Sequence, residues 1–219
     1  MFGNARMEFA ASPLALRGGV LYGSTNLGVA YAVDALSGRI RWITSYDVVY
    51  MPQARLHGQA DRQVFFSNNT PVICNGTLCV TPLDSQFALG IDVDNGTVLW
   101  RLPYDATIGR VENRVQWLVG AIDDEFIFNG AGVIAVKARP EGTFGTEPLA
   151  RQLVHPEQIG NQRKANLPGR AAVSKDHVWV PTSENLLAFD RAGNPHDDLA
   201  RIKLAGYQPG NLMLVDGVI

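Results

Sequence analysis

The sequence predicts an all-β fold in which four-stranded antiparallel units follow one another along the chain. The first observation is an internal repeat, because residues 13–47 and 71–105 align without insertion or deletion, 58 positions apart. The second is the regular spacing of Gly, Asn and Asp residues between short apolar runs, which is typical of strands joined by tight turns. A repeat of this kind indicates that the chain is built from copies of one supersecondary unit.

The residues that the two copies share are those that a strand and turn unit needs. A carboxylate before a tight turn can accept backbone N–H bonds, glycine permits a positive φ, and a large indole can fill the space between splayed sheets. The identical pairs are Pro13/Pro71, Gly18/Gly76, Asp34/Asp92, Gly38/Gly96, Trp42/Trp100, Tyr46/Tyr104 and Asp47/Asp105. We therefore expect structural roles for Asp34, Gly38, Trp42, Asp92, Gly96 and Trp100.

The first two copies are each expected to form an antiparallel meander. In the first copy the turn residues predict strands at residues 11–16, 20–25, 29–34 and 39–44. In the second copy the corresponding strands are expected at residues 70–74, 77–81, 86–92 and 97–102.

Two further copies are more degenerate. The third begins at Val115, has turns at Asp123-Asp124 and Asn129-Gly130, and delays its fourth strand to residues 149–153. The fourth begins at Gly169, with strands expected at residues 178–180 and 186–190. Residues 211–219 have the pattern of the first strand and turn of a fifth copy.

These units predict a β-propeller, because a four-stranded meander has an apolar face on each side and must stack radially on others. We expect residues 1–219 to form a single propeller segment, part of a ring of about seven or eight blades. The chain is interpreted as a segment of a larger propeller, or as one that a partner chain completes. The expected blades are residues 11–44, 70–102, 115–153 and 169–204, with the start of the next at 211–219.

The composition narrows the possible partners. Hydrophobic residues make up 46% of the chain and charged residues 18%, which is sufficient for a large core. A formal net charge of −2 and a pI near 6.1 provide no general basic field, so we expect no nucleic-acid partner. No apolar run reaches the length of a membrane-spanning helix or of a signal-peptide core.

The two cysteines flank a predicted hairpin turn at Asn75-Gly76. In that hairpin Cys74 faces Thr77 and Cys79 faces Val72, so the two sulfur atoms are diagonal neighbours. A strained disulfide is one alternative, and two free thiols in the core are the alternative that this geometry favours.

The segments AVDALSGRIRW and GIDVDNGTVLW resemble the repeat of pyrroloquinoline-quinone-like β-propellers. This family includes quinoprotein alcohol and glucose dehydrogenases, and non-catalytic relatives such as the outer-membrane β-barrel assembly lipoprotein. The resemblance implies that the Asp-x-x-x-Gly turn and the following Trp tie neighbouring blades together. It also implies a periplasmic or extracytoplasmic location.

Two departures from the family distinguish its branches. Quinone-dependent alcohol dehydrogenases carry adjacent cysteines beside the cofactor, and this sequence has neither a Cys-Cys pair nor a C-x-x-C-H haem motif. The resemblance is therefore closest in type to the non-catalytic members, and it implies a scaffold or binding module in a cell-envelope assembly, without a cofactor. The alternative is part of an alcohol or sugar dehydrogenase that uses pyrroloquinoline quinone and calcium.

A candidate binding face follows from the lengths of the connections. Turns in a meander alternate between two faces, and the long connections at residues 44–69, 103–114, 154–168 and 205–210 share one of them. A mildly basic mouth there could receive a carboxylate, a phosphate or an acidic loop, although solvated loop residues are the simpler interpretation. The histidine spacing does not indicate a metal site. The residues proposed for this face are Arg55, His57, Arg62, Asp84, Arg110, Arg114, His155 and Arg163.

Overall fold

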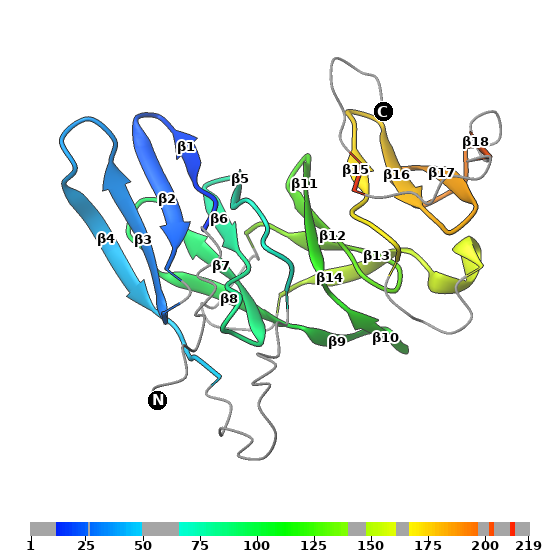
Figure 1. Cartoon of the computed structure of the whole chain (residues 1–219), viewed down its shortest axis with the longest axis horizontal. Coiled ribbons are helices and arrows are strands. Elements are labelled where there is room, and N and C mark those ends of the chain that lie inside the picture. Colours follow the sequence, from blue (N-terminus) through cyan, green and yellow to red (C-terminus); the bar gives the residue numbers. More distant parts are fainter. Residues whose placement is uncertain are drawn as a thin grey trace, which may run out of the picture.

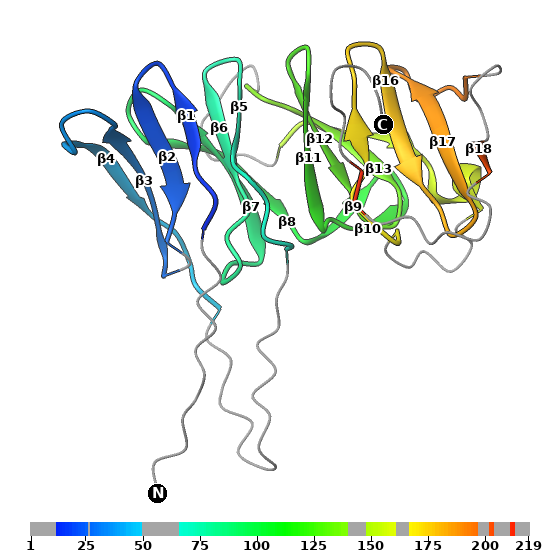
Figure 2. The same ribbon diagram turned by 45° about the horizontal axis from the view of Figure 1, so that its top comes forward.

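The computed structural model describes residues 12–25, 27–49, 66–139, 148–160, 167–196, 202–203 and 211–212. Within these segments the chain forms four sheets of four antiparallel strands, a two-stranded hairpin and one short 3-10 helix. The strands of each sheet follow the order of the sequence, so each sheet is a meander. The sheets lie side by side along an arc (Figures 1 and 2), as blades of a propeller do.

The first two sheets correspond to the two copies of the repeat. The first contains β1 (Ala15–Arg17), β2 (Val20–Ser24), β3 (Val29–Asp34) and β4 (Ile40–Ser45). The second contains β5 (Val72–Cys74), β6 (Thr77–Val80), β7 (Phe87–Asp92) and β8 (Val98–Pro103). The prediction of an all-β chain of four-stranded antiparallel units is confirmed.

The third and fourth sheets follow the more degenerate copies. The third contains β11 (Trp117–Ile122), β12 (Glu125–Asn129), β13 (Val133–Lys137) and β14 (Ala150–Val154). The 3-10 helix η1 (Pro156–Ile159) then leads toward the fourth sheet. That sheet contains β15 (Ala172–Val173), β16 (His177–Pro181), β17 (Asn185–Asp190) and β18 (Ile202–Lys203). Of the expected start of a further blade, only residues 211–212 lie within the described segments.

One connection differs from the prediction. The sequence predicts a long connection at residues 103–114 without assigning strands to it, whereas β9 (Asp105–Ile108) and β10 (Val111–Arg114) form a hairpin there. Gly109 closes the turn with a φ of 66°, a conformation that glycine adopts without steric cost. Ala106 and Asn113 are buried under the hairpin. Strands of four residues with so few apolar positions show only a weak alternation of apolar and polar residues. The sequence therefore did not indicate this hairpin.

The hairpin at Asn75-Gly76 has the predicted register. Cys74 pairs with Thr77 and Cys79 with Val72, and both turn residues have positive φ. The two cysteines are buried free thiols, which decides between the two alternatives left by the sequence. Burial raises the pKa of both thiols, and the Cys74 Sγ donates a hydrogen bond to the Asp123 carbonyl at 3.2 Å.

Neighbouring sheets are joined by an indole that reaches from one sheet to a turn of the next. Trp42 Nε1 donates to the Val93 carbonyl at 2.8 Å, and Trp100 Nε1 donates to the Ala138 carbonyl at 3.0 Å. Val93 and Ala138 both follow directly after the third strand of their own sheets. The same contact is therefore made twice, from the fourth strand of one sheet to the turn of the next.

At the third junction an arginine makes the equivalent contact. Arg151 is opposite Ala135 in the register of β13 and β14, as Trp42 is opposite Ala32 and Trp100 is opposite Gly90. Its Nη2 donates to the Arg191 carbonyl at 3.2 Å, directly after the third strand of the fourth sheet. Two further hydrogen bonds to Glu125, at 3.1 and 2.7 Å, hold the guanidinium in place.

An aspartate orders the turn after the third strand in both the first and the second sheet. The Asp34 carboxylate accepts hydrogen bonds from Leu36 N, Ser37 N, Ser37 Oγ and Arg41 Nη2. In the second sheet, Asp92 accepts from Asp94 N at 3.0 Å and from Arg139 Nη2 at 2.8 Å. The backbone N–H of Ser37 contributes most to lowering the pKa of Asp34, to about 2.

Apolar side chains fill the spaces between the sheets. Leu78 and Ile91 are buried between the first and second sheets, and Trp100 and Phe126 meet edge to face between the second and third. Val178 belongs to the cluster between the third and fourth sheets. The core thus runs from sheet to sheet along the arc.

Replacing Trp100 with alanine should destabilise the protein strongly. The side chain is fully buried, and the Trp100→Ala change removes both its packing and its hydrogen bond. We expect a loss of about 3–5 kcal/mol in the free energy of unfolding, measured by urea denaturation. Leu36→Ala is the control, because Leu36 is 99% exposed and its truncation should change stability by less than about 0.5 kcal/mol. Similar losses for both variants would contradict this account.

The Asp34 turn should make stability depend on pH below the ordinary pKa of aspartate. The folded pKa is about 2, lowered from 3.8, so the ionised carboxylate stabilises the folded state above about pH 4. That contribution is lost as the pH falls through the folded pKa. Carboxyl NMR should show Asp34 titrating near 2, and Ser37→Ala should raise its pKa. Titration of Asp34 at its ordinary value would show that the turn hydrogen bonds do not hold in solution.

Candidate functional site

The described parts of the connections between sheets lie at one end of the sheets, which we call the long-connection face. Figure 2 shows the β9–β10 hairpin and η1 at this end, opposite the tight turns that join the first two strands of each sheet. Its described parts are residues 25, 27–28, 46–49, 66–71, 81–86, 104–116, 130–132, 155–160, 167–171 and 182–184.

Four of the eight residues predicted for a binding face are described, and they do not form one cluster. They are Asp84, Arg110, Arg114 and His155, from three different connections. The other four, Arg55, His57, Arg62 and Arg163, lie outside the described residues.

Asp84 joins the first sheet to the second. Its Oδ1 accepts a hydrogen bond from the Tyr46 hydroxyl at 2.9 Å, and its Oδ2 accepts one from Gly28 N at 3.1 Å. The Asp84 carbonyl also accepts a bond from Val49 N. Both carboxylate oxygens are therefore used in a contact between sheets.

Arg110 and Arg114 belong to the hairpin and face solvent. Arg110 follows Gly109 at the exposed tip, and Arg114 is at the end of β10. Arg114 is opposite Asp105, with 3.9 Å between Nε and the carboxylate, and both side chains are largely exposed. Together with Glu112, these residues give the outer surface of the hairpin charges of both signs.

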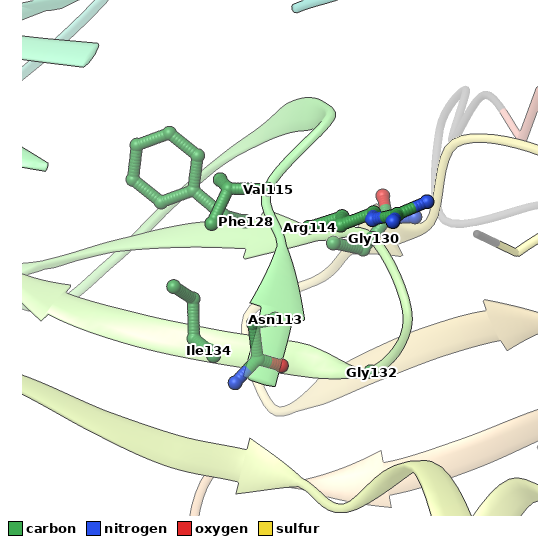
Figure 3. A pocket seen from close by; sticks show the side chains of 8 residues that line it. Asn113, Arg114, Val115, Phe128, Gly130, Gly132 and Ile134 are labelled. Carbon is green, nitrogen blue, oxygen red and sulfur yellow. The ribbon is translucent and has the colours of Figure 1, made fainter. Parts of the chain in front are cut away.

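A small pocket lies between the hairpin and the third sheet (Figure 3). Its empty space of about 130 Å³ includes open solvent, and the part that the protein encloses is far smaller than the roughly 300–1,000 Å³ of pockets that hold small molecules. The Asn113 amide donates to Gln152 Oε1 at 2.9 Å, and Asn129 bonds Gly169 O and Ala171 N. The pocket is therefore a packing feature that fixes the hairpin. Its lining residues are Asn113, Arg114, Val115, Phe128, Asn129, Gly130, Gly132 and Ile134.

His155 caps the 3-10 helix. Its Nδ1 accepts a hydrogen bond from Glu157 N at 3.3 Å, while Gln158 Oε1 accepts one from His155 N at 2.6 Å. This reciprocal pair satisfies backbone N–H groups that the short helix leaves open. The side chain thus has a structural partner of its own.

Arg170 is a residue that sequence reasoning missed. Its Nη2 donates at 2.8 Å to the carbonyl of Val119, which lies at the register shift in β11. Burial lowers the pKa of this guanidinium, and no salt bridge to it is present among the described residues. Asn211 Oδ1 accepts a hydrogen bond from Arg170 N at 3.0 Å. An arginine inside the apolar pattern of the fourth copy is the signal that could have identified it.

This architecture defines the chain as part of a β-propeller built from four-stranded blades. The sequence matches no family model and no curated protein. Solved structures nevertheless share the fold. Their sequence identity to this chain is low, so the likeness concerns the fold alone.

Two of the similar structures are a BamB and a quinohemoprotein alcohol dehydrogenase. BamB from Moraxella catarrhalis matches with a TM-score of 0.52 at 16% identity, over 85% of this chain and 51% of BamB. The quinohemoprotein alcohol dehydrogenase from Comamonas testosteroni matches with a TM-score of 0.52 at 14% identity, over 84% of this chain and 34% of the enzyme. This chain therefore resembles pyrroloquinoline-quinone-like propellers in structure.

A further propeller shows that the likeness extends beyond that class. The β-propeller domain of Cps50 (Swd1) from Myceliophteria thermophila matches with a TM-score of 0.56 at 14% identity, over 94% of this chain and 60% of the domain. In all three cases this chain spans less than two thirds of the structure that it matches.

Two searches of the described residues give negative results. No three His, Cys, Asp or Glu side chains in these segments come close enough together to hold a metal ion. Nor do these segments contain a helix with the length and hydropathy needed to cross a membrane.

The Asp84 carboxylate should stabilise the fold, because it is bound between two sheets and is not a free surface group. We expect Asp84→Ala to lower the free energy of unfolding by about 2 kcal/mol, because it leaves the Tyr46 hydroxyl and Gly28 N–H without their charged acceptor. Arg110→Ala, at an exposed position of the same face, should change it by less than about 0.5 kcal/mol. Urea unfolding of both variants measures the difference, and equal stabilities would contradict the assignment.

Proposed function

We propose that this chain is part of a non-catalytic β-propeller that acts as a scaffold or binding module in a cell-envelope assembly. The observation that carries the proposal is that polar side chains on the long-connection face are hydrogen-bonded to the protein itself. Asp84, His155, Asn113 and Asn129 are each bound to neighbouring structure. Side chains that are bonded in this way make the surface rigid, and few polar groups on it remain to act in catalysis.

The β9–β10 hairpin is the element that we assign to partner contact. It carries exposed charges of both signs, from Asp105, Arg110, Glu112 and Arg114. Mixed charges on a rigid element favour recognition of a complementary protein surface, since they fix orientation and exclude wrong partners. The buried Asn113, bonded to Gln152 on β14, holds the hairpin to the third sheet.

The proposed location is periplasmic or extracytoplasmic, and it rests on the repeat signature. The structural likeness to BamB supports a scaffold of this fold class. We further propose that the rest of the propeller, or other protein chains, are the partners.

The second candidate is part of a quinoprotein dehydrogenase, because a quinohemoprotein alcohol dehydrogenase shares the fold at a similar TM-score. Calcium that accompanies the quinone needs several carboxylate or carbonyl oxygens. Among the described residues no acidic cluster of this kind is present. These segments therefore do not fit the calcium site, and the scaffold is the better supported function.

Site-specific crosslinking tests the proposed contact. A photoreactive benzoylphenylalanine at Arg110 should capture a protein partner in cells that produce this protein. The same residue at Lys175, which is exposed on the β15–β16 turn at the opposite end of the sheets, is the matched control and should capture little. Equal yields at both positions, or none at Arg110, would remove the hairpin from the contact surface.

Reconstitution separates the two candidate functions. The protein is incubated with pyrroloquinoline quinone and Ca²⁺, and dye reduction is followed on a panel of alcohols and sugars. We expect no quinone-dependent reduction. Turnover that requires both quinone and Ca²⁺ would establish the dehydrogenase instead.

A further inference from the structure

The sequence contains three Asn-Gly dipeptides, at Asn75-Gly76, Asn95-Gly96 and Asn129-Gly130. Glycine has no side chain to shield its backbone nitrogen, so this nitrogen can attack the amide carbon of the preceding asparagine. Two of the dipeptides are followed by threonine, at Thr77 and Thr97, and therefore share the tripeptide Asn-Gly-Thr. A difference in reactivity between these two comes mainly from the surrounding fold.

Asn95-Gly96 is held in a closed turn. Asn95 Oδ1 accepts a hydrogen bond from Thr97 N at 2.8 Å, and Gly96 N donates one to the Asp92 carbonyl at 2.9 Å. A Cβ placed on Gly96 would lie 2.8 Å from the Trp42 ring. The attacking nitrogen and the amide are thus both hydrogen-bonded, and the indole crowds the glycine over which a ring would have to close.

Asn129-Gly130 is held inside the third sheet. Asn129 is 1% exposed, and its side-chain amide bonds Gly169 O and Ala171 N. Gly130 N donates to the Gly132 carbonyl at 3.0 Å. Neither group can react until this part of the sheet opens.

Asn75-Gly76 is open by comparison. It forms the tip of the hairpin between β5 and β6, and Asn75 is exposed. Among the described residues no group bonds the Asn75 side chain, and Gly76 N donates no hydrogen bond to any of them. The amide and the nitrogen that attacks it are therefore both available.

A cation lies beside this open turn. A Cβ placed on Gly76 would lie 3.3 Å from Arg139 Nη1, whereas the corresponding neighbours of Gly96 and Gly130 are uncharged atoms. Arg139 Nη2 donates to Asp92 Oδ2 at 2.8 Å, which fixes the guanidinium in this place. Attack by Gly76 N builds negative charge on that nitrogen and then on the amide oxygen, and a fixed cation stabilises such charge as it develops.

We propose that Asn75-Gly76 is a site of spontaneous deamidation and that Arg139 promotes the reaction. Hydroxide removes the proton of Gly76 N, this nitrogen forms a bond to Asn75 Cγ, and the bond between Cγ and Nδ2 breaks. Ammonia leaves with a proton from water, which regenerates hydroxide. Water then opens the succinimide ring at either carbonyl carbon, so that position 75 becomes isoaspartate or aspartate. The proposal does not depend on the scaffold function.

The isoaspartate product affects the first junction between sheets. It places an extra carbon in the backbone of the turn, because the chain then runs through the former side chain. Val93 N donates to the Gly76 carbonyl at 3.1 Å, and the Val93 carbonyl accepts the Trp42 indole at 2.8 Å. A longer turn moves the Gly76 carbonyl away from Val93, and this loosens the residue that the indole contacts.

Rates of deamidation at the matched tripeptides test the site. The purified protein is incubated at mildly alkaline pH, and its peptides are followed by mass spectrometry and by enzymatic methylation of isoaspartate. We expect Asn75 to react about tenfold or more faster than Asn95, because the closed turn must first open locally. In urea the two rates should become similar, since both asparagines precede Gly-Thr. Equal rates in the folded protein, or a difference that persists in urea, would overturn the proposal.

Substitution of Arg139 tests the role of the cation. Arg139→Gln should slow deamidation at Asn75 about threefold or more, because the developing charge loses its partner, and Arg139→Lys should retain most of the rate. Arg101→Gln is the matched control, since Arg101 also pairs with an aspartate and its side chain is 46% exposed, against 45% for Arg139. It should leave the rate at Asn75 unchanged. A rate that does not fall in Arg139→Gln, or that falls as far in Arg139→Lys, would show that Arg139 has no such role.

Hydrogen exchange tests the effect of the product on the junction. Exchange of the Val93 amide, followed by NMR, should be about tenfold faster in the isoaspartyl form, because its acceptor is displaced. Asn75→Asp is the control, since it adds the same charge without the extra backbone carbon, and it should leave this exchange unchanged. Equal protection of Val93 in the isoaspartyl form and the unmodified protein would overturn the proposed effect on the junction.

Discussion

The structure depends on one hydrogen bond that is repeated between sheets, from a side chain on the fourth strand to the carbonyl after the next sheet's third strand. A four-stranded meander is too thin to bury both apolar faces alone, so each sheet requires a neighbour on either side. Apolar packing between sheets is non-directional, whereas this bond fixes their relative position. At the first junction the turn ordered by Asp92 holds the Val93 carbonyl where the Trp42 indole can reach it.

The repeat made the fold predictable from the sequence. The later copies diverge from it, and details of the structure there could not be predicted. The first two copies align without gaps, so strand order, turns and the register of Cys74 with Thr77 followed from the sequence. The donor at the third junction was not predictable, because Arg151 shares no chemical class with tryptophan and lies after a long insertion. The β9–β10 hairpin was missed because four-residue strands carry too little periodicity.

The candidate site was less predictable than the fold. Connection lengths grouped the connections between sheets at one end, but residue type alone did not separate free side chains from bound ones. Asp84 illustrates this limit, since its two partners, Gly28 and Tyr46, are distant in sequence and belong to another sheet. Arg170 shows the reverse case, a half-buried cation that was not distinguished from loop arginines.

The junctions made by tryptophan and the junction made by Arg151 differ in the interactions that hold the two sheets together. Trp100 is fully buried, so its contact excludes water and depends little on salt. Arg151 and Glu125 form a partly exposed ion pair, which ions in solution can screen. Arg191 of the fourth sheet crosses the same junction to the exposed carboxylate of Asp123, and it also bonds the Lys175 carbonyl of its own sheet. Polar contacts therefore supplement the apolar core at the third junction, as the ion pair of Arg139 and Asp92 does at the second.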